Sequence, residues 1–154
     1  MQKSSINRNR ILHKKLASTK YTCDLDNFAS PPMKILLVDD ETDILDSVKS
    51  GLELKGFEVD AFDDPLKALH NFRKGVYEIA LLDIRMPQMN GFQLYNEIRK
   101  RDEEVRVRFF TAYEVYREEF KKAFPELDER RFIQKPTTLA QLSAILLKEV
   151  KVTN

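Results

Sequence analysis

The chain has 154 residues, of which 42% are hydrophobic and 33% charged, and its formal net charge is +1. This size suits a single domain with a real core, and the composition is that of a globular protein. No apolar run approaches the roughly 20 residues of a membrane-spanning helix, and the N-terminus lacks a signal peptide's apolar stretch, so we expect a cytoplasmic protein without a membrane partner. The single cysteine, Cys23, excludes a disulfide framework and a cysteine-built zinc site.

Residues 1–32 form a basic extension. They carry six Lys or Arg and two Asp, whereas the rest of the chain carries 20 basic and 23 acidic residues. Basic tails can bind nucleic acid, but these charges are sparse and are not interleaved with aromatic residues. We therefore expect a flexible, solvated extension and no nucleic-acid binding. Pro31-Pro32 separates it from a domain over residues 33–154, and a natural start at Met33 is the alternative.

From Met33 onward, short apolar runs alternate with helical patterns, which predicts βαβ units and a parallel sheet. The predicted strands span residues 34–38, 57–62, 77–82, 105–110 and 131–134. The predicted helices span about 42–55, 65–74, 92–98, 114–124 and 139–150. The sequence therefore predicts five strands and five helices.

The second predicted helix has clear end signals. Asp64 is a typical N-cap residue, Pro65 suits the first helical position, and Gly75 closes the helix. We expect its core face to consist of Leu66, Leu69 and Phe72.

Polar residues follow four of the predicted strands at the point where each strand ends. They are Asp39 and Asp40, Asp83, Thr111 and Lys135. The carboxyl ends of parallel strands meet at one edge of an open α/β sheet, and ligands bind there. Three carboxylates suit Mg²⁺, and a lysine with a hydroxyl suits a phosphoryl group. The sequence therefore predicts one site that contains all five side chains.

The motifs around these residues resemble the CheY-like receiver domain of response regulators in two-component signalling. The matching segments are LeuLeuValAspAspGlu at 36–41, LeuLeuAspIle at 81–84 with Met86-Pro87 and Gly91, PheThrAla at 110–112, and GlnLysPro at 134–136. The resemblance runs from Met33 to about Val150. It implies a flavodoxin-like, doubly wound five-stranded parallel sheet with strand order 2-1-3-4-5 and five helices.

The resemblance also implies the roles of the acidic residues. Asp83 is expected to be the phosphoacceptor. Asp39, Asp40 and Asp83, together with the backbone carbonyl of Arg85, are expected to hold Mg²⁺, with Mn²⁺ as a substitute. An Asp-Asp pair before a helix also serves as a helix cap, and the two roles are compatible.

The remaining site residues are expected to bind the phosphoryl group or to respond to it. Thr111, Ala112 and Lys135 are expected to contact it, and Phe132 stands at the position of the family's switch aromatic. Pro136 follows Lys135 in the family's typically cis Lys-Pro bond. An ordinary strand aromatic remains the alternative for Phe132.

We expect a stand-alone response regulator, because the last predicted helix ends at about Val150 and the chain at Asn154. It would take a phosphoryl group from a sensor histidine kinase or a phosphotransfer protein. Its output would be a downstream protein, with a homodimer through the fourth helix, fifth strand and fifth helix as a further option. It is not expected to turn over substrate as an enzyme does.

Two other classes of function fit the residues less well. An aspartate-nucleophile phosphatase needs AspXAsp after the first strand, but Glu41 and Thr42 stand where the second Asp would be. A pseudo-receiver that only binds partners would not need the complete set of acidic residues, Thr111 and Lys135.

Two features depart from the expected pattern. Arg106 and Arg108 share one face of a strand that should be apolar, and we expect Arg108 to reach solvent or to pair with an acid, for which helix 114–124 is the first candidate. That helix carries an aromatic stripe at helical spacing, which is either core or a partner-binding patch. The stripe consists of Tyr113, Tyr116, Phe120 and Phe124.

Overall fold

The computed structural model describes residues 32–112, 118, 121–122, 125 and 128–151. The expected basic extension lies outside the described residues apart from Pro32. Most of the expected helix over 114–124 and the whole aromatic stripe also lie outside them. In the described part of the chain, no helix combines the length and the apolar character needed to cross a membrane.

A five-stranded parallel sheet forms the centre of the domain, in the order β2-β1-β3-β4-β5. The strands are β1 (Lys34–Val38), β2 (Glu58–Phe62), β3 (Ile79–Leu82), β4 (Arg106–Thr111) and β5 (Phe132–Gln134). The helices are α2 (Thr42–Leu54), α3 (Pro65–Asn71), α4 (Gly91–Arg101) and α6 (Leu139–Lys151), with a short 3₁₀ helix η2 (Glu129–Arg131). The predicted flavodoxin-like fold and strand order are confirmed. Four of the five expected helices fall within the described residues.

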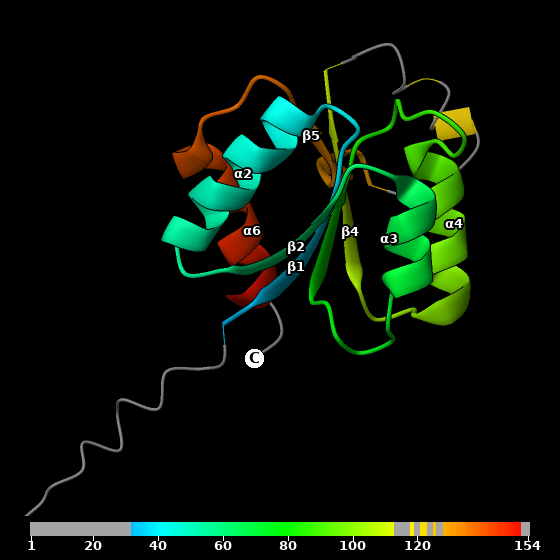
Figure 1. Ribbon diagram of the computed structural model, residues 1–154, viewed down its shortest axis with the longest axis horizontal. Coiled ribbons are helices and arrows are strands. Elements are labelled where there is room, and N and C mark those ends of the chain that lie inside the picture. Colours follow the sequence, from blue (N-terminus) through cyan, green and yellow to red (C-terminus); the bar gives the residue numbers. More distant parts are fainter. Residues whose placement is uncertain (1–31, 113–117, 119–120, 123–124, 126–127, 152–154) are drawn as a thin grey trace, which may run out of the picture. The chain divides into compact units, whose positions relative to one another are not determined.

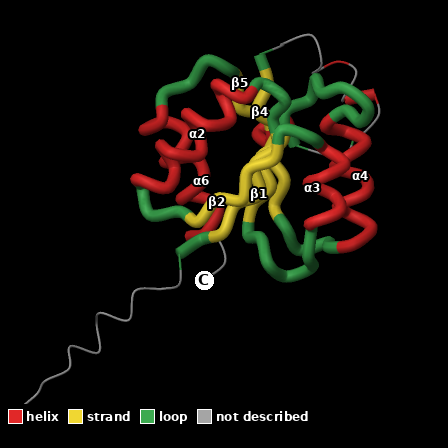
Figure 2. The backbone as a smooth tube through the Cα atoms, viewed as in Figure 1, coloured by secondary structure: helices red, strands yellow, loops and turns green. Residues whose placement is uncertain are grey.

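Helices cover both faces of the sheet. Helices α2 and α6 lie on one face and α3 and α4 on the other, as Figures 1 and 2 show. Strand β1 contributes to a hydrophobic cluster on each side: Leu36 and Val38 pack toward α3 and α4, and Ile35 and Leu37 pack toward α2 and α6. This alternation explains why β1 is a continuous apolar run, since successive side chains of a strand point to opposite faces.

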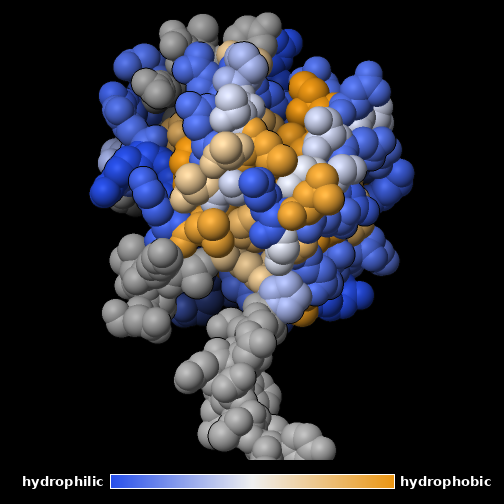
Figure 3. Space-filling model, turned by 90° about the vertical axis from the view of Figure 1, so that its left-hand side faces the viewer, coloured by the Kyte–Doolittle hydropathy of each residue, from blue (hydrophilic) through white to orange (hydrophobic). Residues whose placement is uncertain are grey.

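The outer side of α2 and α6 mixes apolar and polar side chains. Figure 3 looks onto this side of the molecule. Its large exposed apolar residues include Leu54, at the end of α2, and Leu147 of α6. Scattered apolar residues of this kind are normal on a protein surface.

Helix α3 begins as the sequence predicts. The side chain of Asp64 accepts hydrogen bonds from the backbone N–H of Leu66, at 2.7 Å, and of Lys67, at 3.3 Å. Pro65 occupies the first turn. The cap satisfies two N–H groups that have no partner inside the helix, and the proline removes a third.

The predicted core face of α3 was wrong in one position. Leu66 is 45% exposed, whereas Pro65 and Ala68 are buried. The helix also ends at Asn71, before Gly75. Helix α3 has only seven residues, and its buried side is formed by Pro65 and Ala68, which are three positions apart. Leu66 lies on a different side of the helix.

Arg108 pairs with an acid, as expected, but the acid comes from a different helix. Its guanidinium forms an ion pair with the carboxylate of Glu149 on α6, with the two side chains 13% and 21% exposed. The alternation of side chains along β4 explains why the acid comes from α6. Arg108 lies on the same face as Phe110, which packs in the cluster toward α2 and α6.

This ion pair should contribute to stability because both groups are largely withdrawn from water. We expect Glu149→Gln to lower the free energy of unfolding by about 2 kcal/mol, since it leaves Arg108 without its counter-charge. Glu53→Gln is the matched control: Glu53 pairs with Lys49 on the surface at 4.0 Å, and its loss should cost less than about 0.5 kcal/mol. Urea unfolding measures both changes, and equal losses would contradict the buried role of Glu149.

Candidate functional site

Three carboxylates meet where β1 and β3 end. Asp39 and Asp40 directly follow β1, and Asp83 directly follows β3, which pairs with β1 in parallel. The backbone N–H of Asp83 donates to the carbonyl of Val38 at 2.8 Å, which holds the two strand ends together. Each of the three residues offers a carboxylate oxygen within 4.8 Å of the others. The predicted convergence of these acids is therefore present in the structure.

Lys135 reaches this group from the end of β5. Its Nζ lies 2.6 Å from Oδ2 of Asp39 and 3.6 Å from Oδ1 of Asp83, and its side chain is 7% exposed. The ammonium group also lies 5.1 Å from the centre of the Phe110 ring. The backbone N–H of Lys135 donates to the carbonyl of Thr111 at 2.8 Å, which ties the ends of β4 and β5 together. The lysine is thus buried among acids.

Burial dominates the electrostatics of the acids. It raises the pKa of Asp83 to about 6, an effect that the charge of Lys135 partly offsets and the nearby charge of Asp39 reinforces. Burial likewise raises the pKa of Asp39, against the opposing hydrogen bond from Lys135. Burial acts to lower the pKa of Lys135, but its hydrogen bond to Asp39 and the charge of Asp83 outweigh this, so the pKa is raised. The lysine therefore stays charged, and Asp83 is mostly ionised at pH 7.

These residues fit a divalent cation. Carboxylate oxygens are the ligands that Mg²⁺ prefers, and three of them converge here from separate residues. The raised pKa values of Asp39 and Asp83 reflect the cost of burying acids close together. One lysine does not remove that cost, whereas a bound cation would favour the ionised form of each acid.

The loop after Asp83 is held close to it by a glycine. A Cβ atom on Gly91 would lie 2.2 Å from the backbone oxygen of Asp83 and 2.9 Å from Cα of Ile84. The N–H of Gly91 donates to the carbonyl of Ile84 at 2.9 Å. Asn90 and Gln93 cap the start of α4 through reciprocal hydrogen bonds of 2.9 Å. The close approach of α4 to the loop therefore depends on the absence of a side chain at Gly91.

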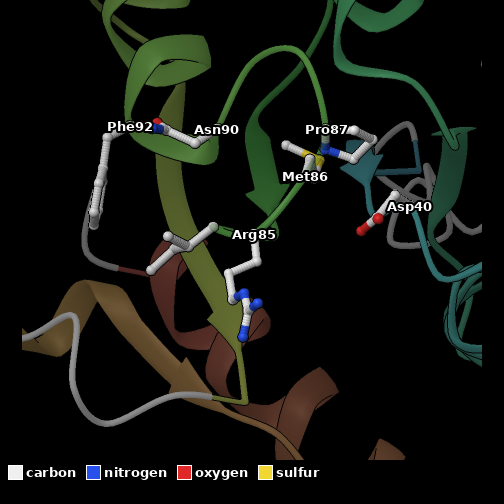
Figure 4. A pocket seen from close by; sticks show the side chains of 7 residues that line it. Asp40, Arg85, Met86, Pro87, Asn90 and Phe92 are labelled. Carbon is white, nitrogen blue, oxygen red and sulfur yellow. The ribbon is translucent and has the colours of Figure 1, made fainter.

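A cavity of about 470 Å³ opens beside the acids. Its lining comes from Asp40 and from the loop and helix start after Asp83, and it comprises Asp40, Ile84, Arg85, Met86, Pro87, Asn90 and Phe92. Figure 4 shows the carboxylate of Asp40 turned toward the side of the cavity where Arg85 lies. Two of the residues predicted to hold a metal, Asp40 and Arg85, therefore face the same cavity.

The other predicted site residues lie at the ends of β4 and β5. Thr111 is buried at the end of β4, and Ala112 after it is exposed. The peptide bond between Lys135 and Pro136 is cis. Phe132 begins β5, and its ring lies 5.4 Å from that of Phe109, centre to centre.

The sequence reasoning missed one acid of the site. Oε1 of Glu41 lies 3.6 Å from Nζ of Lys135, and its backbone N–H donates to the carboxylate of Asp39 at 3.0 Å. The sequence feature that could have indicated Glu41 as a site residue is its position directly after the Asp39-Asp40 pair. The reach of its long, exposed side chain back to a lysine 94 positions later could not be inferred from local pattern.

Comparison with known proteins decides the family. The model of the family described as the response regulator receiver domain matches residues 35–147, most of the chain. This chain belongs to the response-regulator receiver family. The convergence of acids and lysine described above is accordingly found in a CheY-like domain of two-component signalling.

Curated relatives cover the same region of the chain. The transcriptional regulatory protein PrrA of Mycobacterium leprae is 33% identical over 120 residues, which is 78% of this chain and 50% of PrrA. The transcriptional regulatory protein TctD of Salmonella typhimurium is 32% identical over 114 residues, 74% of this chain and 50% of TctD. The chain thus spans about half the length of these relatives.

Solved receiver structures match the fold. The non-phosphorylated HemR receiver domain of Leptospira biflexa has a TM-score of 0.69 and 27% identity, covering 79% of this chain and 97% of that one. The response regulator TrrA of Thermotoga maritima, solved in complex with Mg²⁺ and BeF, has a TM-score of 0.64 and 30% identity, covering 76% and 98%.

The contact at Gly91 can be tested by adding one methyl group. We expect Gly91→Ala to destabilise the fold by about 3 kcal/mol, because rigid backbone atoms of Asp83 and Ile84 would have to move. Gly51→Ala is the control, since its Cβ would meet the side chain of Leu139, which can change rotamer. Thermal unfolding compares the two variants. A Gly91→Ala loss no larger than that of Gly51→Ala would show that the loop yields easily.

The raised pKa of Asp83 has a consequence for stability. Folded Asp83 holds its proton up to about pH 6, above its ordinary pKa of 3.8. The folded state therefore binds more protons than the unfolded state between these values, and stability falls as the pH rises through this range. In EDTA at pH 8, we expect Asp83→Asn to be more stable than wild type by on the order of 2 kcal/mol. The gain should vanish near pH 4 in urea unfolding, whereas a gain independent of pH would contradict this origin.

Proposed function

We propose that Asp83 accepts a phosphoryl group from a phosphohistidine donor and that the modified domain then binds a downstream partner. One observation carries the proposal. Asp83 lies with Asp39, Lys135 and the more exposed Asp40 in one group, in which carboxylate oxygens of the three acids are within 4.8 Å of one another and Lys135 is 3.6 Å from Asp83. Such a group combines a nucleophile, a cation-binding set and a fixed positive charge. Membership of the receiver family, in which phosphoacceptance is general, supports it.

The transfer follows from the groups present. A carboxylate oxygen of Asp83 attacks the phosphorus atom and forms an acyl phosphate. The bond between phosphorus and the histidine nitrogen breaks, and that nitrogen keeps the electron pair. Because the pKa of Asp83 is about 6, most of the carboxylate is ionised and able to attack at pH 7. The cavity lined by Asp40 and Arg85 opens next to the residue that follows Asp83, and the donor is proposed to approach from this side.

Lys135 and Thr111 are proposed to hold the transferred group. Lys135 now binds Asp39 at 2.6 Å and would turn part of its charge toward the phosphoryl oxygens. The hydroxyl of Thr111 and the backbone of Ala112 would donate from the end of β4. Asp39, Asp40, Asp83 and the Arg85 carbonyl would hold Mg²⁺, or Mn²⁺ in its place. The metal would offset the repulsion between these acids and an incoming phosphoryl group.

The output step is proposed to start from the same residues. Movement of Thr111 toward the phosphoryl group would leave space behind it, into which Phe132 would turn from its contact with Phe109. This change would alter the surface around β4, β5 and α6, where a target protein or a second copy of the chain would bind. A stand-alone role, a cytoplasmic location, non-enzymatic action and the absence of nucleic-acid binding stay predictions from the sequence.

A pseudo-receiver that binds partners without phosphorylation is the competing proposal. The two are separated by treating the protein with acetyl phosphate, with and without Mg²⁺, and measuring intact mass. We expect one phosphoryl adduct that requires Mg²⁺ and is absent in Asp83→Asn. Lys135→Ala should lower the yield or rate at least tenfold, because the fixed positive charge is lost.

Matched variants make this result specific. Asp60→Asn removes an acid that lies on β2 and pairs with Lys34, away from this site, and its adduct should equal that of wild type. An adduct that persists in Asp83→Asn would move the acceptor elsewhere. No adduct at all, together with no stabilisation by Mg²⁺ in thermal unfolding, would favour the pseudo-receiver.

A further inference from the structure

A second cavity lies at the opposite end of β4 from the phosphoacceptor site. Its volume is about 590 Å³, and it is lined from the end of α4 and the loop after it, the start of β4, η2 and the last turns of α6. Five of its lining residues are arginines: Arg99, Arg106, Arg108, Arg130 and Arg131. Because β4 runs from this cavity toward Thr111, the cavity and the group around Asp83 lie at opposite edges of the sheet.

Four acids line this cavity together with the arginines. Glu149 pairs with Arg108. Asp128 pairs with Arg130, at 2.5 Å from Nη2 and 2.7 Å from Nε. The remaining two acids, Glu103 and Glu104, are exposed to solvent, where a carboxylate interacts weakly with a partly buried charge.

Arg131 carries an unused donor inside the protein. Its Nη1 donates to the carbonyl of Val107 at 3.3 Å, but its buried Nε has no hydrogen-bond acceptor among the described residues. A buried donor without an acceptor is costly and rare, and an ion or water commonly supplies the missing partner.

The guanidinium groups also repel one another. Burial lowers the pKa of Arg108, and the positive charges of Arg131 and Arg130 lower it further, while the charge of Asp128 offsets part of this effect. Arginines placed this close cost electrostatic energy, which Glu149 and Asp128 offset in part. An oxyanion between them would accept several N–H bonds at once and remove the repulsion, since the planar guanidinium fork matches phosphate and carboxylate geometry.

We propose that this cavity binds a small molecule that carries a phosphate or carboxylate group, held chiefly by Arg131 with Arg108 and Arg130. The site is separate from the phosphoryl group on Asp83 and does not depend on that function. The shared chemistry is an oxyanion of at least one full negative charge. Its binding should weaken with salt, because much of the attraction is between charges.

The test uses the full chain labelled with ¹⁵N, freed of divalent cations and then dialysed into chelator-free buffer, because EDTA is itself a polycarboxylate. Inorganic phosphate and citrate are titrated separately against sodium chloride of equal ionic strength, and amide shifts are followed. We expect saturable shifts for phosphate, citrate or both at Val107, Arg131 and their neighbours. Arg131→Gln should weaken binding at least tenfold, and Arg130→Gln at least threefold.

Arg101→Gln is the matched control. Arg101 is an exposed arginine on α4 whose Nη1 donates to the carbonyl of Leu69 at 2.5 Å, outside this cavity, so its loss changes net charge equally. Wild-type affinity in this variant supports a local site. Equal weakening in Arg101→Gln, shifts that never saturate, or shifts confined to the edge around Asp83 would each overturn the proposal. If Arg131→Gln unfolds, Arg130→Gln decides, because the side chain of Arg130 is 87% exposed.

Discussion

The domain depends on one constraint: two carboxylates, of Asp39 and Asp83, are buried together at the carboxyl edge of the sheet. Strand order places the ends of β1 and β3 side by side, and Asp39 and Asp83 emerge there from apolar strands. Loss of water raises the pKa of both acids, the charge of Asp39 adds to the rise at Asp83, and Lys135 offsets only part of that cost. The site therefore favours a cation for the same electrostatic reason that it weakens the fold.

Packing and hydrogen bonds elsewhere in the domain hold this edge of the sheet in place. Two apolar clusters, one on each face of the sheet, hold β1 and β3 between helices, so the strand ends cannot separate. Gly91 lets the start of α4 approach the backbone of Asp83, and the cap formed by Asn90 and Gln93 fixes that helix. Backbone hydrogen bonding between Lys135 and Thr111 joins the last two strand ends. Precise placement of charged groups thus rests on ordinary packing and capping.

Strand β4 connects two regions of opposite charge. Its last residue, Thr111, belongs to the acidic edge, and its first residues line the arginine-rich cavity. The ion pair of Arg108 and Glu149 fastens the middle of this strand to α6. A polar contact in an otherwise apolar layer of this kind costs desolvation, and it fixes which helix covers that part of the sheet.

Sequence patterns predicted most strand positions to within two residues, because apolar runs and turn residues act locally. They predicted the cap at Asp64 for the same reason, and they placed Asp39, Asp40, Asp83 and Lys135 at one edge once a parallel sheet was assumed. They did not predict which of two nearby apolar residues is buried. In α3, Leu66 and Ala68 both suit a core position, and the packing of a short helix selected Ala68.

The sequence by itself determined the family, the fold class and the types of group at the site, since these follow from periodicity and from motifs of fixed spacing. Only the tertiary structure decided which charges meet: Glu149 with Arg108, Glu41 with Lys135, and the arginines around Arg131. The physical reason is that periodicity specifies the face on which a side chain lies, whereas an ion pair depends on distances between segments far apart in the chain.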